Sequence, residues 1–149
     1  MRRWLLISSA AAFIVLVGCV NPATQAKERQ AAIEARVKRE NAEEAELKGL
    51  IAKFKCVYVT RSSLPYDFTF IDKDSVENSK RADGLWWYAF NPKDGQQIMV
   101  RAWSGSSYNT HNEWDTIEAS IYVHGKLWKT EKKKGINAEN AQIWGTWDS

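Results

Sequence analysis

The residue types that usually carry catalysis are sparse and scattered in this chain of 149 residues. The two histidines are His111, in a polar stretch, and His124, next to Gly125. Neither has a second histidine or a cysteine at the spacing of metal ligands. No serine lies in a G-x-S-x-G pattern, and no glycine-rich phosphate loop is present. We therefore expect a protein that is not an enzyme and that uses no metal and no cofactor.

A polar segment between two tryptophans is the first candidate for a binding site. It runs from Ser104 to Glu113 and is flanked by Trp103 and Trp114. Polar loops held by a rigid sheet often carry binding residues, and aromatic anchors supply much of the binding energy. The alternative is a plain connection between two strands. The residues that we expect to contact a partner are Ser104, Tyr108, His111, Trp103 and Trp114.

A lysine-rich run at 126–134 is the second candidate. It contains five lysines and Trp128 within nine residues. Such a basic patch would attract phosphate-bearing lipid or an acidic protein. The alternative is a solvated strand end whose lysines discourage edge-to-edge pairing. The lysines of the predicted patch are Lys126, Lys129, Lys132, Lys133 and Lys134.

The N-terminal segment 1–18 has the layout of an export signal. Two arginines near its start precede an apolar stretch at 4–17, which is shorter than a membrane span of about 20 residues. The run Leu-Val-Gly-Cys that ends at Cys19 resembles the lipobox of bacterial lipoproteins. This resemblance implies that the signal is removed and that Cys19 carries acyl chains such as palmitate, two or three of which anchor a protein firmly. An ordinary signal peptide with an incidental cysteine is the alternative.

Val20 follows the cysteine where some lipoproteins have Asp. By the sorting rule of those lipoproteins, this resemblance implies a lipid-anchored protein of the cell envelope, on the outer membrane and facing the periplasm. Two of the 21 basic residues lie in the signal, which leaves 19 basic and 18 acidic side chains. This near-neutral balance gives no reason to expect nucleic acid binding.

Segment 19–53 reads as a lipidated cysteine followed by a charged helical stalk. It is rich in Ala, Glu, Lys and Arg, which favours one helix of about 30 residues. A heptad seam along it would place Glu40 and Glu44 at core positions, so we expect a monomer. The pairs at helical spacing are Glu34–Lys38, Arg36–Glu40, Arg39–Glu43 and Glu44–Lys48. The residues expected to dock its last turns on the following domain are Leu47, Leu50, Ile51 and Phe54.

Segment 54–149 changes to short apolar or alternating stretches joined by turns. This pattern predicts a mainly β domain, a small antiparallel sheet that is curled or closed into a barrel. The turn at 91–95, with Pro92 and Gly95, and the turn at His124-Gly125 are typical of hairpins. Cys56 lies in an apolar strand, so we expect it to be buried. The predicted strands are 56–60, 67–71, 85–90, 98–103, 117–123, 126–130 and 142–147.

Seven tryptophans remain once the signal is removed, more than a small core needs. Trp86 and Trp87 are neighbours on one strand and should point to opposite faces. Some of the other rings should lie at the surface, where an indole suits a protein partner or the flat face of a sugar.

The run Ser-Gly-Ser-Ser-Tyr at 104–108 resembles a segment of the membrane-bound inhibitors of chicken-type lysozyme, which are small β-barrel lipoproteins. The resemblance implies that Ser104 and Tyr108 contact the enzyme. The paired cysteines of that family are absent here. The function that we expect is an envelope lipoprotein with a non-enzymatic β-rich domain that binds a periplasmic or surface partner. The alternatives are a lysozyme inhibitor and a prophage or plasmid exclusion lipoprotein.

Overall fold

The computed structural model describes residues 22–104 and 112–148. Cys19, Tyr108 and His111 lie outside the described residues. The chain divides into two compact units, Met1–Glu40 and Asn41–Ser149. The long helix α1, Pro22–Lys53, begins in the first unit, and its last turns belong to the second.

The part of α1 in the first unit is solvated along residues 23–40, which are all exposed. The predicted pair between Arg36 and Glu40 is confirmed, with 2.7 Å between Nε and Oε1. Six residues earlier, Gln30 donates a hydrogen bond to Glu34 at 2.9 Å. Local pairs of this kind stabilise an exposed helix by a few tenths of a kcal/mol each. The predicted helix is therefore confirmed.

The last turns of α1 pack on the β strands, as the cluster of apolar residues there indicates. Leu47 is only 2 % exposed and packs against Val57 and Val59. Glu44 was expected to pair with Lys48 but instead faces Arg61. The two terminal nitrogens of Arg61 donate hydrogen bonds to the carboxylate of Glu44, Nη1 to Oε1 and Nη2 to Oε2, the latter at 3.2 Å. This hydrogen bond from Arg61 lowers the pKa of Glu44. Helical spacing indicates partners only within the helix, so it could not predict that Glu44 pairs with Arg61 of β1.

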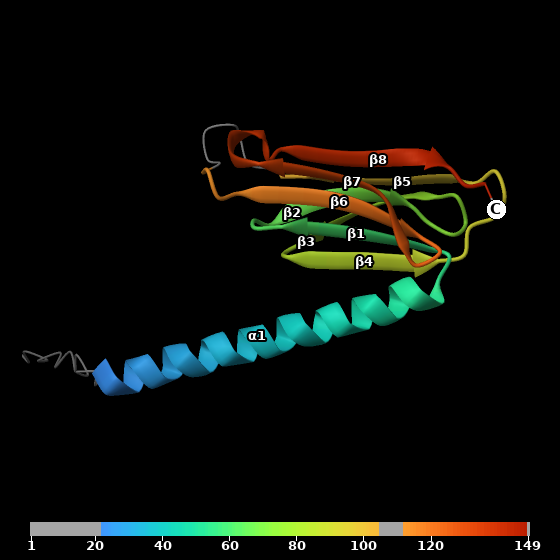
Figure 1. The fold of residues 1–149 in the computed structure, drawn as a ribbon. Helices are drawn as coiled ribbons and strands as arrows, with labels where there is room; N and C mark the ends of the chain where they lie inside the picture. Colours follow the sequence, from blue (N-terminus) through green and yellow to red (C-terminus); the bar gives the residue numbers. More distant parts are fainter. Residues whose placement is uncertain (1–21, 105–111, 149) are drawn as a thin grey trace, which may run out of the picture. The chain divides into compact units, whose positions relative to one another are not determined.

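Within residues 22–104 and 112–148, eight strands form two antiparallel sheets of four strands each, whose arrangement Figure 1 shows. The first sheet has the order β4-β1-β6-β7 and the second the order β3-β2-β5-β8. The expectation of a mainly β, antiparallel domain is confirmed, but the two sheets do not close into a barrel. The strands are β1 Cys56–Ser62, β2 Tyr66–Ile71, β3 Glu77–Ala82, β4 Leu85–Phe90, β5 Gln97–Trp103, β6 Thr116–Val123, β7 Lys126–Lys134 and β8 Asn140–Thr146.

The two predicted turns have different roles. His124 and Gly125 have φ angles of 47° and 79° and join β6 to its partner β7, so this hairpin is confirmed. The turn at 91–95 joins β4 to β5, which belong to different sheets. It therefore carries the chain from one layer to the other, and the hairpin expected there is wrong. A turn sequence shows that the chain reverses, but not which strand it will pair with.

Strand β3 was not predicted. Its sequence is Glu-Asn-Ser-Lys-Arg-Ala, with no alternation of apolar and polar residues, because it is an edge strand paired only with β2. Strand β7 also runs further than expected, to Lys134. A short 3₁₀ turn, Gly135–Asn137, separates it from β8. Both differences concern polar edge strands, where hydrophobic periodicity gives no signal.

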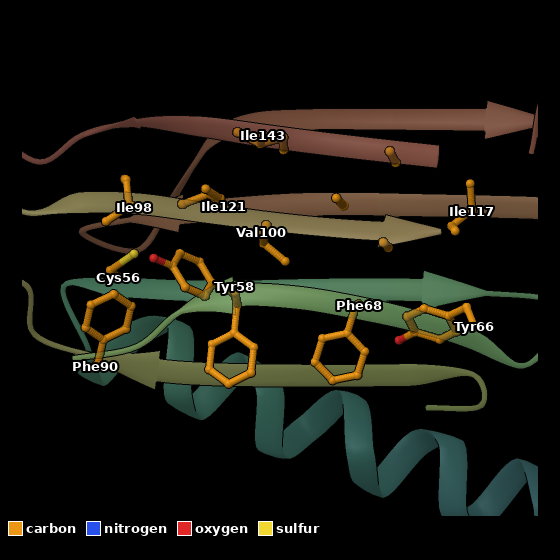
Figure 2. Close-up of a cluster of buried hydrophobic side chains, with 14 of the residues drawn as sticks. Cys56, Tyr58, Tyr66, Phe68, Phe90, Ile98, Val100, Ile117, Ile121 and Ile143 are labelled. Carbon is orange, nitrogen blue, oxygen red and sulfur yellow. The ribbon is translucent and has the colours of Figure 1, made fainter. Parts of the chain in front are cut away.

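The core lies between the inward faces of the two sheets. In Figure 2 the rings of Tyr58, Tyr66, Phe68 and Phe90 lie towards one side of this layer, and aliphatic side chains lie towards the other. Cys56 is fully buried, as expected, and burial raises the pKa of its thiol to about 12. It is therefore an inert part of the core.

The two adjacent tryptophans on β4 point to opposite faces, as predicted. Trp86 packs on the core between the sheets, and Trp87 belongs to the cluster that contains Leu47. The tryptophans left exposed at the surface are Trp114, Trp128 and Trp144, with exposed fractions of 71 %, 39 % and 69 %.

Candidate functional site

Trp114 is presented by a hydrogen-bonded turn at 112–115. The amide of Trp114 donates to Asn112 Oδ1 at 2.8 Å, and the amide of Asn112 donates to Asp115 Oδ2 at 2.7 Å. Asp115 is buried, and its carbonyl accepts a hydrogen bond at 2.8 Å from the amide of Gly135. The backbone under Trp114 is thus tied down, while the indole itself remains largely in solvent. Such an arrangement is preorganised for contact with a partner.

A surface groove of about 490 Å³ lies beside this ring, and we name it the Trp114 groove. Ile136 contributes an aliphatic side chain that is 68 % exposed. Lys134 places its ammonium 5.4 Å from the centre of the Trp114 ring. The groove is lined by Glu113, Trp114, Lys134, Gly135 and Ile136. It combines an aromatic anchor with an aliphatic contact, as the centres of protein-binding surfaces do, and Glu113 and Lys134 supply the charged groups.

The other described residues of the predicted loop site lie elsewhere. Ser104 is buried: its hydroxyl donates to the carbonyl of Ala138 at 3.1 Å and its amide to the carbonyl of Glu139 at 3.0 Å. This serine anchors the end of β5. The guanidinium carbon of Arg101 lies over the Trp103 ring, 5.3 Å from the ring centre. Trp103 does not line the Trp114 groove.

The lysines of the predicted basic patch do not share one surface. Along β7 successive residues point to opposite faces, so Lys132 lies opposite Glu118 on one face and Lys133 opposite Ile117 on the other. Lys132 forms an ion pair with Glu118 at 3.3 Å, and Lys133 forms one with Glu131 at 2.9 Å. The remaining lysines are exposed and differ in setting: Lys126 by the hairpin turn, Lys129 over Trp128, and Lys134 over Trp114.

Asp72 and His124 are two titratable residues whose contacts are structural. Asp72 accepts hydrogen bonds from the amides of Val76 and Asp74 and from the side chain of Asn78, and these bonds lower its pKa. His124 lies at the hairpin turn with its ring 5.3 Å from that of Trp147. No group of three or more His, Cys, Asp or Glu residues in ranges 22–104 and 112–148 could hold a metal ion.

Comparison with known proteins gives no match: no family model, no curated protein and no solved structure corresponds to this chain. Within the part of the chain that the structure describes, no helix is both long and apolar enough to cross a membrane.

Proposed function

We propose that this protein is a lipid-anchored envelope protein that binds a protein partner through the Trp114 groove. The anchoring part of the proposal is supported by the lipobox-like run that ends at Cys19. The observation that carries the binding part is the exposed Trp114 on its tied-down turn, next to the exposed Ile136. An isolated exposed side chain is ordinary, but an exposed indole on a hydrogen-bonded turn beside an apolar neighbour has the features of a binding hot spot.

Anchoring is tested by metabolic labelling with a fatty-acid analogue. The expected result is a labelled wild-type protein in the membrane fraction and an unlabelled Cys19→Ser variant. An unlabelled wild-type protein would contradict the lipid anchor, whatever its effect on binding.

Binding is tested by capture of partners from the native envelope with the wild-type protein and two matched variants. Trp114→Ala should weaken capture of a specific partner at least fivefold, which corresponds to about 1 kcal/mol. Trp144→Ala removes an equally exposed indole elsewhere and should leave that capture unchanged. Both rings are largely in solvent, so neither variant should lower the melting temperature. Equal capture by all three proteins would overturn the proposal.

The same purified proteins are assayed as inhibitors of chicken-type lysozyme. Inhibition that is lost in Trp114→Ala would identify the partner as that enzyme and support the groove as the contact. Inhibition that Trp114→Ala retains would place the contact elsewhere and contradict the proposal.

A further inference from the structure

The outward face of β5 and β8 carries a row of aromatic and polar side chains that the Trp114 groove does not use. Cross-strand neighbours on this face are Met99 with Trp144, Arg101 with Gln142, and Trp103 with Asn140. Because alternate residues of a strand share a face, Met99, Arg101 and Trp103 lie on the same side of the sheet. Trp144 is 69 % exposed, and Arg101 is also exposed. This surface is therefore open to solvent.

A groove of about 600 Å³ adjoins this face where the edge strands β7 and β8 meet. No backbone ladder joins these two described strands; instead the amide of Gln142 donates to the carboxylate of Glu131 at 2.8 Å. The groove is bordered by Lys129 and Thr130 of β7 and by Gln142 and Trp144 of β8. Gln142 and Trp144 thus belong to both the face and the groove.

Trp128 is fitted onto the backbone of Gly145 at the end of this groove. A register shift in the β6–β7 ladder accompanies its insertion. A Cβ atom added at Gly145 would lie only 2.5 Å from Cη2 of Trp128. The Trp128 ring can occupy this position only because residue 145 is a glycine and has no side chain. The ammonium of Lys129 lies 4.3 Å from the centre of the Trp128 ring and 3.4 Å from the carbonyl oxygen of Trp144. A positive charge is therefore held beside the indole of Trp128 and the backbone of Trp144.

We propose that this face and groove bind an anionic glycan, a chain of sugar rings that carries carboxylate groups. The C–H face of a sugar ring can stack on an exposed indole such as Trp144. Its hydroxyl groups match side chains that both donate and accept, such as Gln142 and Thr130. Its carboxylates match the cations of Lys129 and Arg101.

The dimensions of the face favour a chain of sugars over a single one. Trp103 lies four residues along β5 from Met99, the cross-strand partner of Trp144. At about 3.4 Å per residue, the backbone positions that carry the two indoles are roughly 14 Å apart along the strand. A ligand that reaches from Trp144 to Arg101, whose guanidinium lies over the Trp103 ring, must be extended and flat. The sheet face provides such a platform.

Two other ligand classes fit these residues less well. The side chains between the indoles are polar, Arg101 and Gln142, whereas the centre of a protein interface is largely apolar. Nucleic acid binding depends on several cations that neutralise phosphates. Here the cations that the proposal uses are one lysine of the groove, Lys129, and one arginine of the face, Arg101, fewer than a nucleic acid backbone with a phosphate at every nucleotide requires.

The probe is a purified peptidoglycan glycan strand without its peptides, in which every second amino sugar carries a lactyl carboxylate. Chitooligosaccharides of the same length have the same backbone without that carboxylate and serve as the neutral control. Binding is measured by calorimetry with the full chain in mild detergent. The wild-type protein should bind the charged strand at least fivefold more tightly than the neutral one, and added salt should reduce this difference.

Variants locate the site. Trp144→Ala should weaken binding of the charged strand at least tenfold, Trp144→Phe should retain part of the affinity, and Trp114→Ala should change nothing. Lys129→Met should reduce the preference for the charged strand at least threefold, and Lys129→Arg should preserve it. Equal melting temperatures of these surface variants show that the fold is intact.

Several results would overturn the inference. These are no binding of the strand at millimolar concentration, equal affinity for charged and neutral strands, and full affinity in Trp144→Ala. Tighter binding of single-stranded DNA than of the glycan would assign the face to nucleic acid instead. Since Trp114→Ala tests the protein partner independently, the glycan site can fail while the proposed function stands, and the reverse also holds.

Discussion

Replacing Leu47 by Ala tests whether the end of α1 is part of the β domain or only its neighbour. Leu47 is 2 % exposed and packs on Val57 and Val59 of β1. The substitution removes three carbon atoms, about 0.8 kcal/mol each in transfer free energy, and it leaves a cavity as well. We therefore expect the free energy of unfolding to fall by about 2–5 kcal/mol.

The assay is urea unfolding followed by tryptophan fluorescence, since Trp87 lies in the same cluster as Leu47. With a urea dependence of roughly 1–3 kcal/mol per molar, the midpoint should move down by about 1 M or more. Ile33→Ala removes the same number of carbon atoms from the same helix, but Ile33 is 56 % exposed. This control should change stability by less than about 0.5 kcal/mol.

Truncation extends this test to the domain boundary. A chain that starts at Asn41 retains the packed turns of α1 and should unfold cooperatively. Composition alone predicts that a chain starting at Phe54 also folds, but the Leu47 contacts predict that it is less stable by at least the cost of Leu47→Ala. The reasoning fails if Leu47→Ala costs less than about 1 kcal/mol, or if the two truncated chains are equally stable.

Three further perturbations follow from the core, the helix contact and the Trp128 contact. Burial raises the pKa of Cys56 from 9.0 to about 12, so the neutral thiol is favoured in the folded state. The contribution of the neutral Cys56 thiol to the free energy of unfolding should be complete below pH 9 and be lost as the pH rises towards 12. In Cys56→Ala the urea midpoint should therefore depend less on pH over this range. The hydrogen bond from Arg61 lowers the pKa of Glu44, so that contact should be lost as the pH falls below 4.5. A double-mutant cycle of Glu44→Gln and Arg61→Met should give a coupling of about 0.2–1 kcal/mol at pH 7, because both side chains are 38 % exposed, and no coupling at pH 2. Gly145→Ala should displace the Trp128 ring, shift its fluorescence and cost about 1–3 kcal/mol; an unchanged spectrum and stability would contradict the close contact.

Local patterns in the sequence were sufficient for several elements of the fold. The charge pairs and alanine content of α1 act within one or two turns, so its extent follows from neighbours in the chain. Alternation of apolar residues predicts β6 for the same reason, because one of its faces is buried. The proposed lipid anchor at Cys19 is also a local signal, which a peptidase would meet in an extended chain.

Strand pairing and burial were decided by contacts between distant residues. Trp144 and Trp147 are three residues apart, yet the first is 69 % exposed and the second 2 %. Which ring is covered depends on the opposite sheet, and the sequence pattern contains no information about its position. The Glu44–Arg61 contact likewise joins the helix to β1 across 17 residues.

The lysine-rich run at 126–134 also separates what the sequence determines from what the tertiary structure decides. The sequence alone determines that five lysines fall within residues 126–134 and that an edge strand there would resist aggregation. The tertiary structure decides that Lys132 and Lys133 face opposite ways and that Lys129 lies beside Trp128. The direction of each side chain follows from the two-residue period of the strand. The residue that each lysine contacts depends on which strand lies next to it, and only the folded chain determines this.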